Sequence, residues 1–334
     1  MTAQVIGVSG SPVDGGATDR VVGRIMEAAG LESELVRLWD IDVQPCKACL
    51  ACAGSNICTG FDDDWLPLAV KLVRADALVV GGWAPFNILD ARSKTLVERA
   101  FSLRHSILLN AGTVGVAVIT GTADPVPVAD DVLAWFESEG LEPLGKVTPA
   151  GIDPCWSCGL GERCVVGGTV PLVRGEYELF WYPYKDRLPA PEGFVIAPEL
   201  VPPPPEEQPH VMAEAERLGR ALGEAVRVRQ AERTAALERA LPGHASRAPL
   251  ARLRVLLAAA GEASVGGDGT LDTLLETAER QAGRSQARPA VITLLDFGRR
   301  LLWERRVEDP TARDLLAAET RRAIAELYEA AAAG

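Results

Sequence analysis

This sequence predicts a doubly wound α/β fold, in which helices cover a five-stranded parallel sheet, followed by a helical C-terminal region. Three observations support the prediction. Apolar runs of strand length alternate with amphipathic helix patterns over roughly the first 150 residues, a Gly/Ser-rich loop follows the first run, and only helical patterns follow residue 210. Such alternation implies right-handed crossovers and a parallel sheet with helices on both faces.

The elements follow one another in a regular order. Residues 4–9 (QVIGVS) form the first strand, and Val21, Val22 and Ile25 share one face of a helix over 18–29. The run at 77–82 is unbroken and apolar, which is typical of a strand buried on both faces. The other strands are predicted at 34–38, 115–120 and 147–152, and the other helices at 62–74, 93–104 and 127–139.

The composition changes in the C-terminal half. A proline-rich segment at about 198–209 is expected to be extended, and a long helix follows at 210–240. Amphipathic helices are then predicted around 253–257, 271–278, 290–303 and 312–327. We therefore divide the chain into a cofactor domain at 1–240 and a helical extension at 245–334, whose pattern suits packing or dimerisation.

Charge narrows the class of protein. The net charge of −12 argues against nucleic acid and against an anionic membrane surface, because both need clustered Lys and Arg. The N-terminus has no basic leader region, and no apolar stretch approaches the length of a membrane span. We expect a cytoplasmic protein.

The loop after the first strand is a candidate phosphate site. It reads SGSPVDGGAT over residues 9–18 and opens a helix, so backbone N–H groups and hydroxyls converge at the helix N-terminus. It has neither the Lys-Ser/Thr ending of a Walker A loop nor the G-x-G-x-x-G of dinucleotide folds. Ser9, Ser11 and Thr18 are the predicted donors to a monophosphate.

The seven cysteines fall into two groups. The first, Cys46, Cys49, Cys52 and Cys58, has the compact spacing that wraps a single iron–sulfur cubane in ferredoxins. Zinc is the main competitor, although structural zinc sites usually pair two C-x2-C knuckles across a longer spacer, and a disulfide redox relay is a third reading. The second group is Cys155, Cys158 and Cys164, for which a second cluster and zinc are equally good interpretations, with free thiols as the remaining one.

The order of phosphate loop, compact cysteine run and third-strand loop resembles the iron–sulfur flavoproteins, a flavodoxin-like branch of the NADPH-dependent FMN reductases. The resemblance covers roughly residues 5–168, and its cysteine motif is the specific part. It implies flavin mononucleotide (FMN) and a [4Fe–4S] cluster as cofactors. It also implies a homo-oligomer in which the cluster of one subunit lies near the flavin of another.

The resemblance assigns roles to individual residues. Ser9, Ser11 and Thr18 correspond to the FMN phosphate loop, and Lys94 corresponds to a family lysine. The loops that border the flavin correspond to Trp83, Ala84, Pro85, Phe86 and Asn87, and to Thr120, Gly121 and Thr122. The chain departs from the family loop at two places, where Val13 replaces an arginine and Ala17 an asparagine.

The function that follows is electron transfer between a reduced donor, ferredoxin or NAD(P)H, and an unidentified acceptor. The cofactors supply the chemistry, so no catalytic side chain is predicted. Two alternatives remain. One is a flavin-only NAD(P)H-dependent quinone or FMN reductase with structural zinc, and the other is a non-catalytic scaffold that has lost its flavin.

Overall fold

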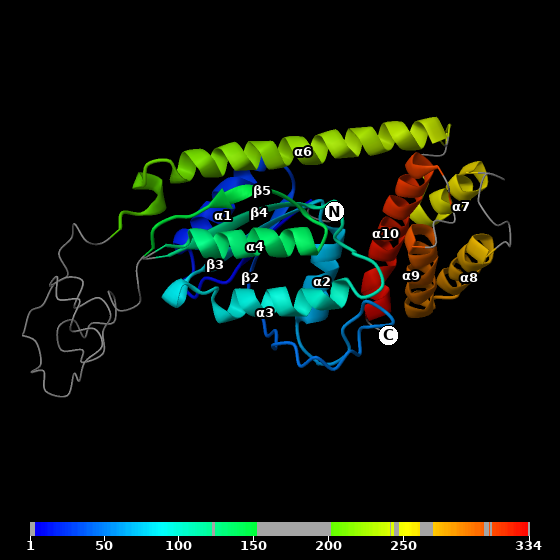
Figure 1. Cartoon of the computed structure of the whole chain (residues 1–334), viewed down its shortest axis with the longest axis horizontal. Coiled ribbons are helices and arrows are strands. Elements are labelled where there is room, and N and C mark those ends of the chain that lie inside the picture. The colour runs from blue at the N-terminus through cyan, green and yellow to red at the C-terminus, as the bar shows by residue number, and fades with distance from the viewer. Residues whose placement is uncertain are drawn as a thin grey trace, which may run out of the picture.

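A five-stranded parallel sheet forms the centre of the structure, a computed structural model that describes residues 4–121, 124–151, 202–240, 242–243, 247–260, 270–303, 307 and 309–332 (Figure 1). Its order is β2-β1-β3-β4-β5, the order of flavodoxin-like folds, which confirms the predicted fold class. The strands are β1 (Val5–Ser9), β2 (Ser33–Arg37), β3 (Ala77–Trp83), β4 (Val114–Thr120) and β5 (Glu142–Val147).

Helices α1 (Ala17–Ala29) and α6 (Val211–Ala240) cover one face of the sheet. They approach each other closely because α6 carries glycine where the two helices meet. A Cβ at Gly219 would lie 2.4 Å from the carbonyl oxygen of Ile25, and one at Gly223 would lie 2.1 Å from that of Ala29. The long predicted helix at 210–240 is therefore a layer of the α/β region, entered through the short 3-10 helix η8 (Pro205–Glu207).

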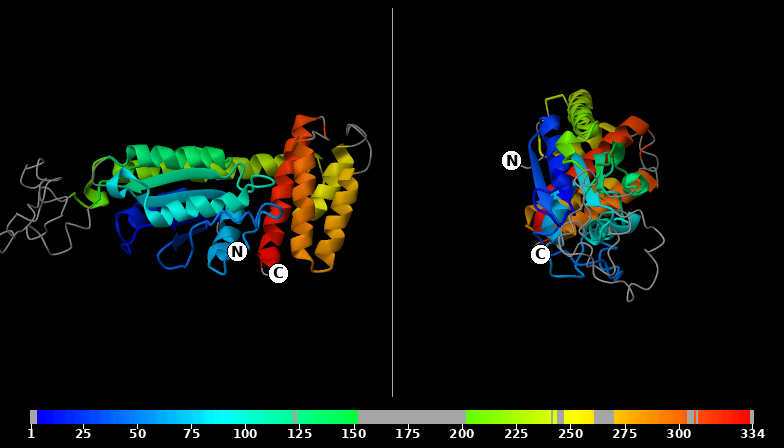
Figure 2. Two further views of the ribbon diagram at one scale, coloured as in Figure 1. Left: turned by 60° about the horizontal axis from the view of Figure 1, so that its bottom comes forward. Right: turned by 90° about the vertical axis from the view of Figure 1, so that its left-hand side faces the viewer.

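The opposite face is covered by α2 (Trp65–Arg74), α3 (Ala91–Ala100) and α4 (Val126–Ser138). The core on this side is continuous with that of the C-terminal helices α7 (Pro249–Ala260), α8 (Thr270–Gly283), α9 (Ala287–Trp303) and α10 (Pro310–Ala332). These four helices stand beside the end of the sheet at which the strands begin (Figure 2). Helix α10 makes the contact with α2, where Arg74 Nε donates to the carbonyl of Ala325 at 3.1 Å.

Two element boundaries differ from the prediction. The fifth strand is not at 147–152 but at Glu142–Val147, because this edge strand is half exposed and lacks the unbroken apolar run of β3 and β4. Helix α2 begins at Trp65 rather than at residue 62, because the carboxylates before it bind elsewhere. Asp64 accepts from the backbone N–H of Asp42 at 2.7 Å.

A buried ion pair holds the loop between β2 and α2 against α3. Arg99 and Asp63 have side chains that are 1% exposed and lie 2.5 Å apart. Arg99 also donates to the carbonyl of Gln44 at 2.8 Å, and its guanidinium lies against the rings of Phe61 and Trp65. Burial raises the pKa of Asp63, but hydrogen bonds from Arg99 and from two backbone N–H groups outweigh it and hold that pKa below its ordinary value.

The described helices carry no membrane span. Within those residues, we find none that combines the length and the apolar character needed to cross a bilayer.

Removing the charge of Asp63 should destabilise the fold strongly. We expect Asp63→Asn to lower the free energy of unfolding by about 3–5 kcal/mol, because it leaves the buried Arg99 without a counter-charge. Urea denaturation at pH 7 measures the loss. The matched control, exposed Asp62→Asn, should change stability by less than about 0.5 kcal/mol.

The ion pair of Asp63 and Arg99 should also make the free energy of unfolding depend on pH in the acidic range. Because the pKa of Asp63 is lowered on folding, its contribution is complete above the unfolded value near 3.8 and is lost as pH falls through the folded value. The difference in the free energy of unfolding between the unaltered protein and Asp63→Asn should therefore shrink as the pH is lowered. Equal stability at pH 7 would contradict the role given to the pair.

Candidate functional site

The predicted flavin loops meet at the carboxyl edge of the sheet. The hydroxyls of Thr18 and Thr120 lie 2.8 Å apart, although more than a hundred residues separate them in sequence. The backbone N–H of Ala84 donates to the carbonyl of Thr120 at 2.8 Å, and that of Gly10 to the carbonyl of Gly81 at 2.9 Å. The loops after β1, β3 and β4 are thus one connected surface, with Gly121 at its border; Thr122 lies outside the described residues.

The hydroxyls of the first loop make internal hydrogen bonds. Ser9 donates to the carboxylate of Asp19, and Ser11 donates to the carbonyl of Val13 at 3.0 Å. Asp19 also accepts from the backbone N–H of Gly15 at 3.0 Å. Sequence reasoning missed Asp19, a buried acid in the first turn of α1, which organises the loop and adds a negative charge beneath it.

Arg37 supplies a cation at this loop. Its Nε lies 2.9 Å from Asp19, and its Nη2 lies 3.4 Å from the carbonyl oxygen of Ser11. Val13, which stands where the family has an arginine, is exposed. Arg37 is the last residue of β2, and a charged residue at a strand's carboxyl end was the available sequence signal.

The loop after β3 presents an aromatic side chain to solvent. Pro85–Asn87 forms the single 3-10 turn η1 after Trp83 and Ala84, and both Phe86 (φ 54°) and Asn87 (φ 57°) lie in the left-handed region. The Phe86 side chain is 93% exposed. A non-glycine residue held in this conformation is strained, which is typical of loops that bind ligands.

Asp90 fixes the loop after β3 through hydrogen bonds to its backbone. Its carboxylate accepts from the backbone N–H groups of Trp83 at 3.1 Å and Ser93 at 2.8 Å, and so caps the N-terminus of α3. Burial raises the pKa of Asp90, and these hydrogen bonds oppose the rise. A Cβ at Gly10 would lie 2.1 Å from the Ser93 hydroxyl, so the close fit of α3 against the phosphate loop requires glycine there.

Asp90 was not predicted, although an aspartate directly before a helix is an N-cap signal. Lys94, which the resemblance carried over, lies on the exposed side of α3 and pairs with Glu98 at 2.8 Å. In this structure it makes no part of the edge surface described above.

The first cysteine group lies on the loop between β2 and α2. All four are free thiols; Cys46 and Cys49 are exposed, Cys52 is half-buried and Cys58 is buried. Ala48 and Leu50 have left-handed backbones (φ 53° and 57°), so the chain turns sharply between the thiols. Among the described residues, however, no three His, Cys, Asp or Glu side chains gather as a metal ligand set.

The donor chemistry of this loop fits an iron–sulfur cluster. The set consists of thiols from one short loop, which are the ligands that [4Fe–4S] clusters take. Burial raises the pKa of Cys52, and its electrostatic interaction with Cys58 raises it further. Zinc accepts the same ligands, so the donor set alone does not choose between the two metals.

Two anchors hold the loop, and both were missed from sequence. Arg99 Nη2 donates to Cys58 Sγ at 3.4 Å, which connects the buried thiol to the ion pair with Asp63. Asn56, fully buried, bonds the backbone of Ser106 and Ile107, and its own carbonyl accepts from the Tyr328 hydroxyl at 2.6 Å. Burial raises the pKa of Tyr328, so this hydroxyl stays protonated as the donor.

The second cysteine group lies outside the described residues. This applies to Cys155, Cys158 and Cys164 alike, so their metal remains a sequence prediction.

Comparisons with known proteins match part of the chain to iron–sulfur flavoproteins. It is 31% identical over 121 residues to an iron–sulfur flavoprotein of Methanosarcina thermophila and 32% identical over 123 residues to one of Methanocaldococcus jannaschii. The matches cover 35% and 36% of this chain and 63% of each relative, so the chain spans under two thirds of the curated relatives' length. No protein-family model matches.

Solved structures resemble the fold more distantly. RosB with bound 8-demethyl-8-formylriboflavin-5'-phosphate is 15% identical, with a TM-score of 0.45 over 68% of this chain and 80% of that one. The NAD(P)H:quinone oxidoreductase of Methanothermobacter marburgensis is 13% identical, with a TM-score of 0.37 over 46% and 86%. The relationship therefore rests on the sequence matches: over 121 to 123 residues, this chain is a homologue of the iron–sulfur flavoproteins, as its motifs predicted.

Proposed function

We propose that this protein is an electron-transfer flavoprotein that binds FMN at the carboxyl edge of the sheet and a [4Fe–4S] cluster on the loop of Cys46, Cys49, Cys52 and Cys58. The observation that carries the proposal is the attachment of a four-thiol loop to the same helix, α3, that closes the flavin edge. Relatives named for both cofactors support it.

The edge residues suit the parts of FMN in different ways. Thr18 and Thr120 present adjoining hydroxyls, and the N-terminus of α1 offers the positive end of its dipole to a phosphate. Arg37 is paired with Asp14, Asp19 and Asp40, so its part is to hold the loop. Trp83 to Asn87, with exposed Phe86, would lie against the isoalloxazine ring. Bound FMN exchanges electrons in pairs or singly and a cubane exchanges one at a time, so the two together can divide an electron pair.

The protein's own contribution is to fix geometry and surroundings. Asp90 holds the ring loop in its strained conformation, and Arg99 places a positive charge against the Cys58 sulfur. Hydrogen bonds to a ligand sulfur are among the factors that set a cluster's reduction potential. The donor is proposed to be ferredoxin or NAD(P)H, the acceptor remains unassigned, and a homo-oligomer is proposed as the assembly.

Anaerobic purification tests the cofactor assignment. We expect broad absorption near 400 nm, bound FMN, and about four irons and four sulfides per chain for a single [4Fe–4S] cluster. Cys49→Ala, at an exposed position, should lose the iron while the fold remains, and Leu50→Ala in the same loop should keep it.

Two other results of the metal analysis would change the assignment. About eight irons would assign Cys155, Cys158 and Cys164 to a second cluster. Zinc without iron, in protein never exposed to air, would remove the iron–sulfur proposal and leave a flavin reductase with a structural metal.

A flavin titration tests the edge separately. Thr18→Val removes a hydroxyl but keeps the shape, and we expect the Kd for FMN to rise about tenfold, since a hydrogen bond to a charged phosphate contributes about 1.5 kcal/mol. Quenching of flavin fluorescence gives the Kd. Thr234→Val, on the exposed side of α6, is the matched control and should bind FMN as the unaltered protein does.

An unchanged Kd in Thr18→Val would show that the phosphate binds elsewhere. If the unaltered protein bound no FMN, the flavin proposal would be wrong. The internally bonded serines and the departures at Val13 and Ala17 would then favour the scaffold reading.

A further inference from the structure

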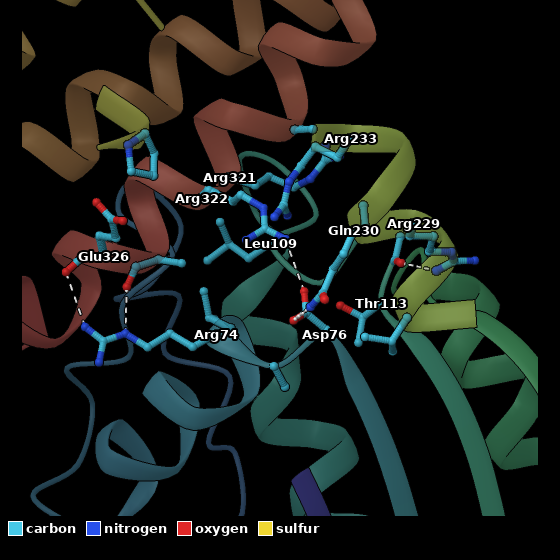
Figure 3. Close-up of a pocket in the computed structure, with 18 of the residues that line it drawn as sticks. Arg74, Asp76, Leu109, Thr113, Arg229, Gln230, Arg233, Arg321, Arg322 and Glu326 are labelled. Atoms are coloured by element: carbon cyan, nitrogen blue, oxygen red, sulfur yellow. Dashed lines mark hydrogen bonds and ion pairs between the residues drawn. The ribbon is translucent and has the colours of Figure 1, made fainter. Parts of the chain in front are cut away.

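A cavity of about 750 Å³ lies at the amino edge of the sheet, opposite the flavin edge (Figure 3). Its walls come from the end of α2, from the residues just before β3 and β4, and from α6, α7 and α10. This volume is within the usual range of small-molecule sites, roughly 300–1,000 Å³. The cofactors proposed above make no use of it.

The lining of the cavity is strongly basic. Seven arginines line it against two acidic residues, Asp76 and Glu326. That balance is unusual in a chain whose net charge is −12. A concave surface of one charge sign raises the local concentration of ligands of the opposite sign.

Four of these arginines are already neutralised by neighbours. Arg322 lies 3.1 Å from Asp76, whose other oxygen accepts from Gln230 at 2.9 Å. Arg74 pairs with Glu329 at 2.9 Å, Arg252 with Glu319 at 2.6 Å, and Arg229 with Glu142. These pairs build the wall, and Glu326 is the acidic lining residue that they do not include.

Of the other three arginines, Arg247 is exposed, and Arg233 and Arg321 make no ion pair within the described part of the chain. Arg233 of α6 and Arg321 of α10 form no hydrogen bond or ion pair with any residue that the structure describes, and the buried Nε of Arg233 has no acceptor. Figure 3 shows both side chains extending from their helices into the same part of the cavity. Burial lowers the pKa of Arg321, against the opposing charge of Asp314, which shows how poorly its cation is solvated.

Two partly desolvated guanidinium groups facing one cavity need an anion. A buried cation without a counter-charge is costly, and two of them near each other add repulsion. The planar guanidinium fork matches the oxygens of phosphate and carboxylate groups in a bidentate manner. Of these, a phosphate carries the higher charge per group and so fits the excess of arginine better.

We propose that this cavity is a binding site for a phosphate-bearing metabolite, whose phosphate oxygens bridge Arg233 and Arg321. The site is separate from the FMN phosphate loop, which lies at the other edge of the sheet. Because Arg233 belongs to α6 and Arg321 to α10, a bound phosphate would join the α/β region to the C-terminal helices.

Calorimetric titration of the full chain tests the proposal, with pyrophosphate as the probe, saturating FMN present and ionic strength held constant. FMN occupies the phosphate loop, so the heat reports on the second site. We expect saturable binding of one pyrophosphate per chain. Arg233→Gln and Arg321→Gln should each weaken it about tenfold, whereas Arg217→Gln, an exposed arginine of α6, should leave it unchanged.

A variant could also lose affinity because its fold is damaged. Thermal unfolding of each variant without pyrophosphate distinguishes this from the loss of a phosphate contact. Arg321→Gln should then unfold at the same or a higher temperature than the unaltered protein, because it removes a partly desolvated charge that makes no ion pair among the described residues. A lower Tm would mean that Arg321 supports the fold instead, and would overturn the proposal. So would the absence of saturable binding, an affinity in both variants equal to that of the unaltered protein, or citrate binding as tightly as pyrophosphate.

Discussion

The position of the cysteine loop depends on one buried cation. Arg99 reaches the loop at separate points, through the Asp63 carboxylate, the Gln44 carbonyl and the Cys58 sulfur, and the rings of Phe61 and Trp65 enclose it. A lysine has one point charge and no planar fork, so it could not make these contacts together. Because a buried charge is costly without its partners, conformations of the loop that abandon Arg99 are disfavoured.

Helix α3 connects this loop with the flavin edge. Asp90 caps its first turn and fixes the ring loop, while Arg99 binds the Cys58 side near its last turn. The distance from Ala91 to Arg99 along the axis is about 12 Å, at roughly 1.5 Å per residue. A single rigid element thus fixes the spacing of the two proposed cofactor positions within one chain, whatever the assembly adds.

Sequence predicted those features that repeat along the chain and missed those that depend on contacts between distant residues. The buried strands β3 and β4 were predicted from their apolar runs. The contact between Thr18 and Thr120 follows from the parallel sheet, because the loop after β1 and the end of β4 lie at the same edge. Strand β5 was misplaced because an edge strand is only half buried. No role was predicted for Arg99, since its burial is created by a loop some forty residues earlier in the chain.

The hydrogen bond from Tyr328 to the carbonyl of Asn56 has a consequence for biogenesis. It joins residues 272 positions apart and lies next to the thiols of the metal loop. During synthesis the N-terminal region emerges and begins to fold first, with its metal loop still lacking this support. The final form of the loop is reached only after α10 has left the ribosome, so the nascent chain passes through a period in which four thiols are displayed without their last restraint. Insertion of the proposed cluster into the completed fold would therefore follow the synthesis of α10.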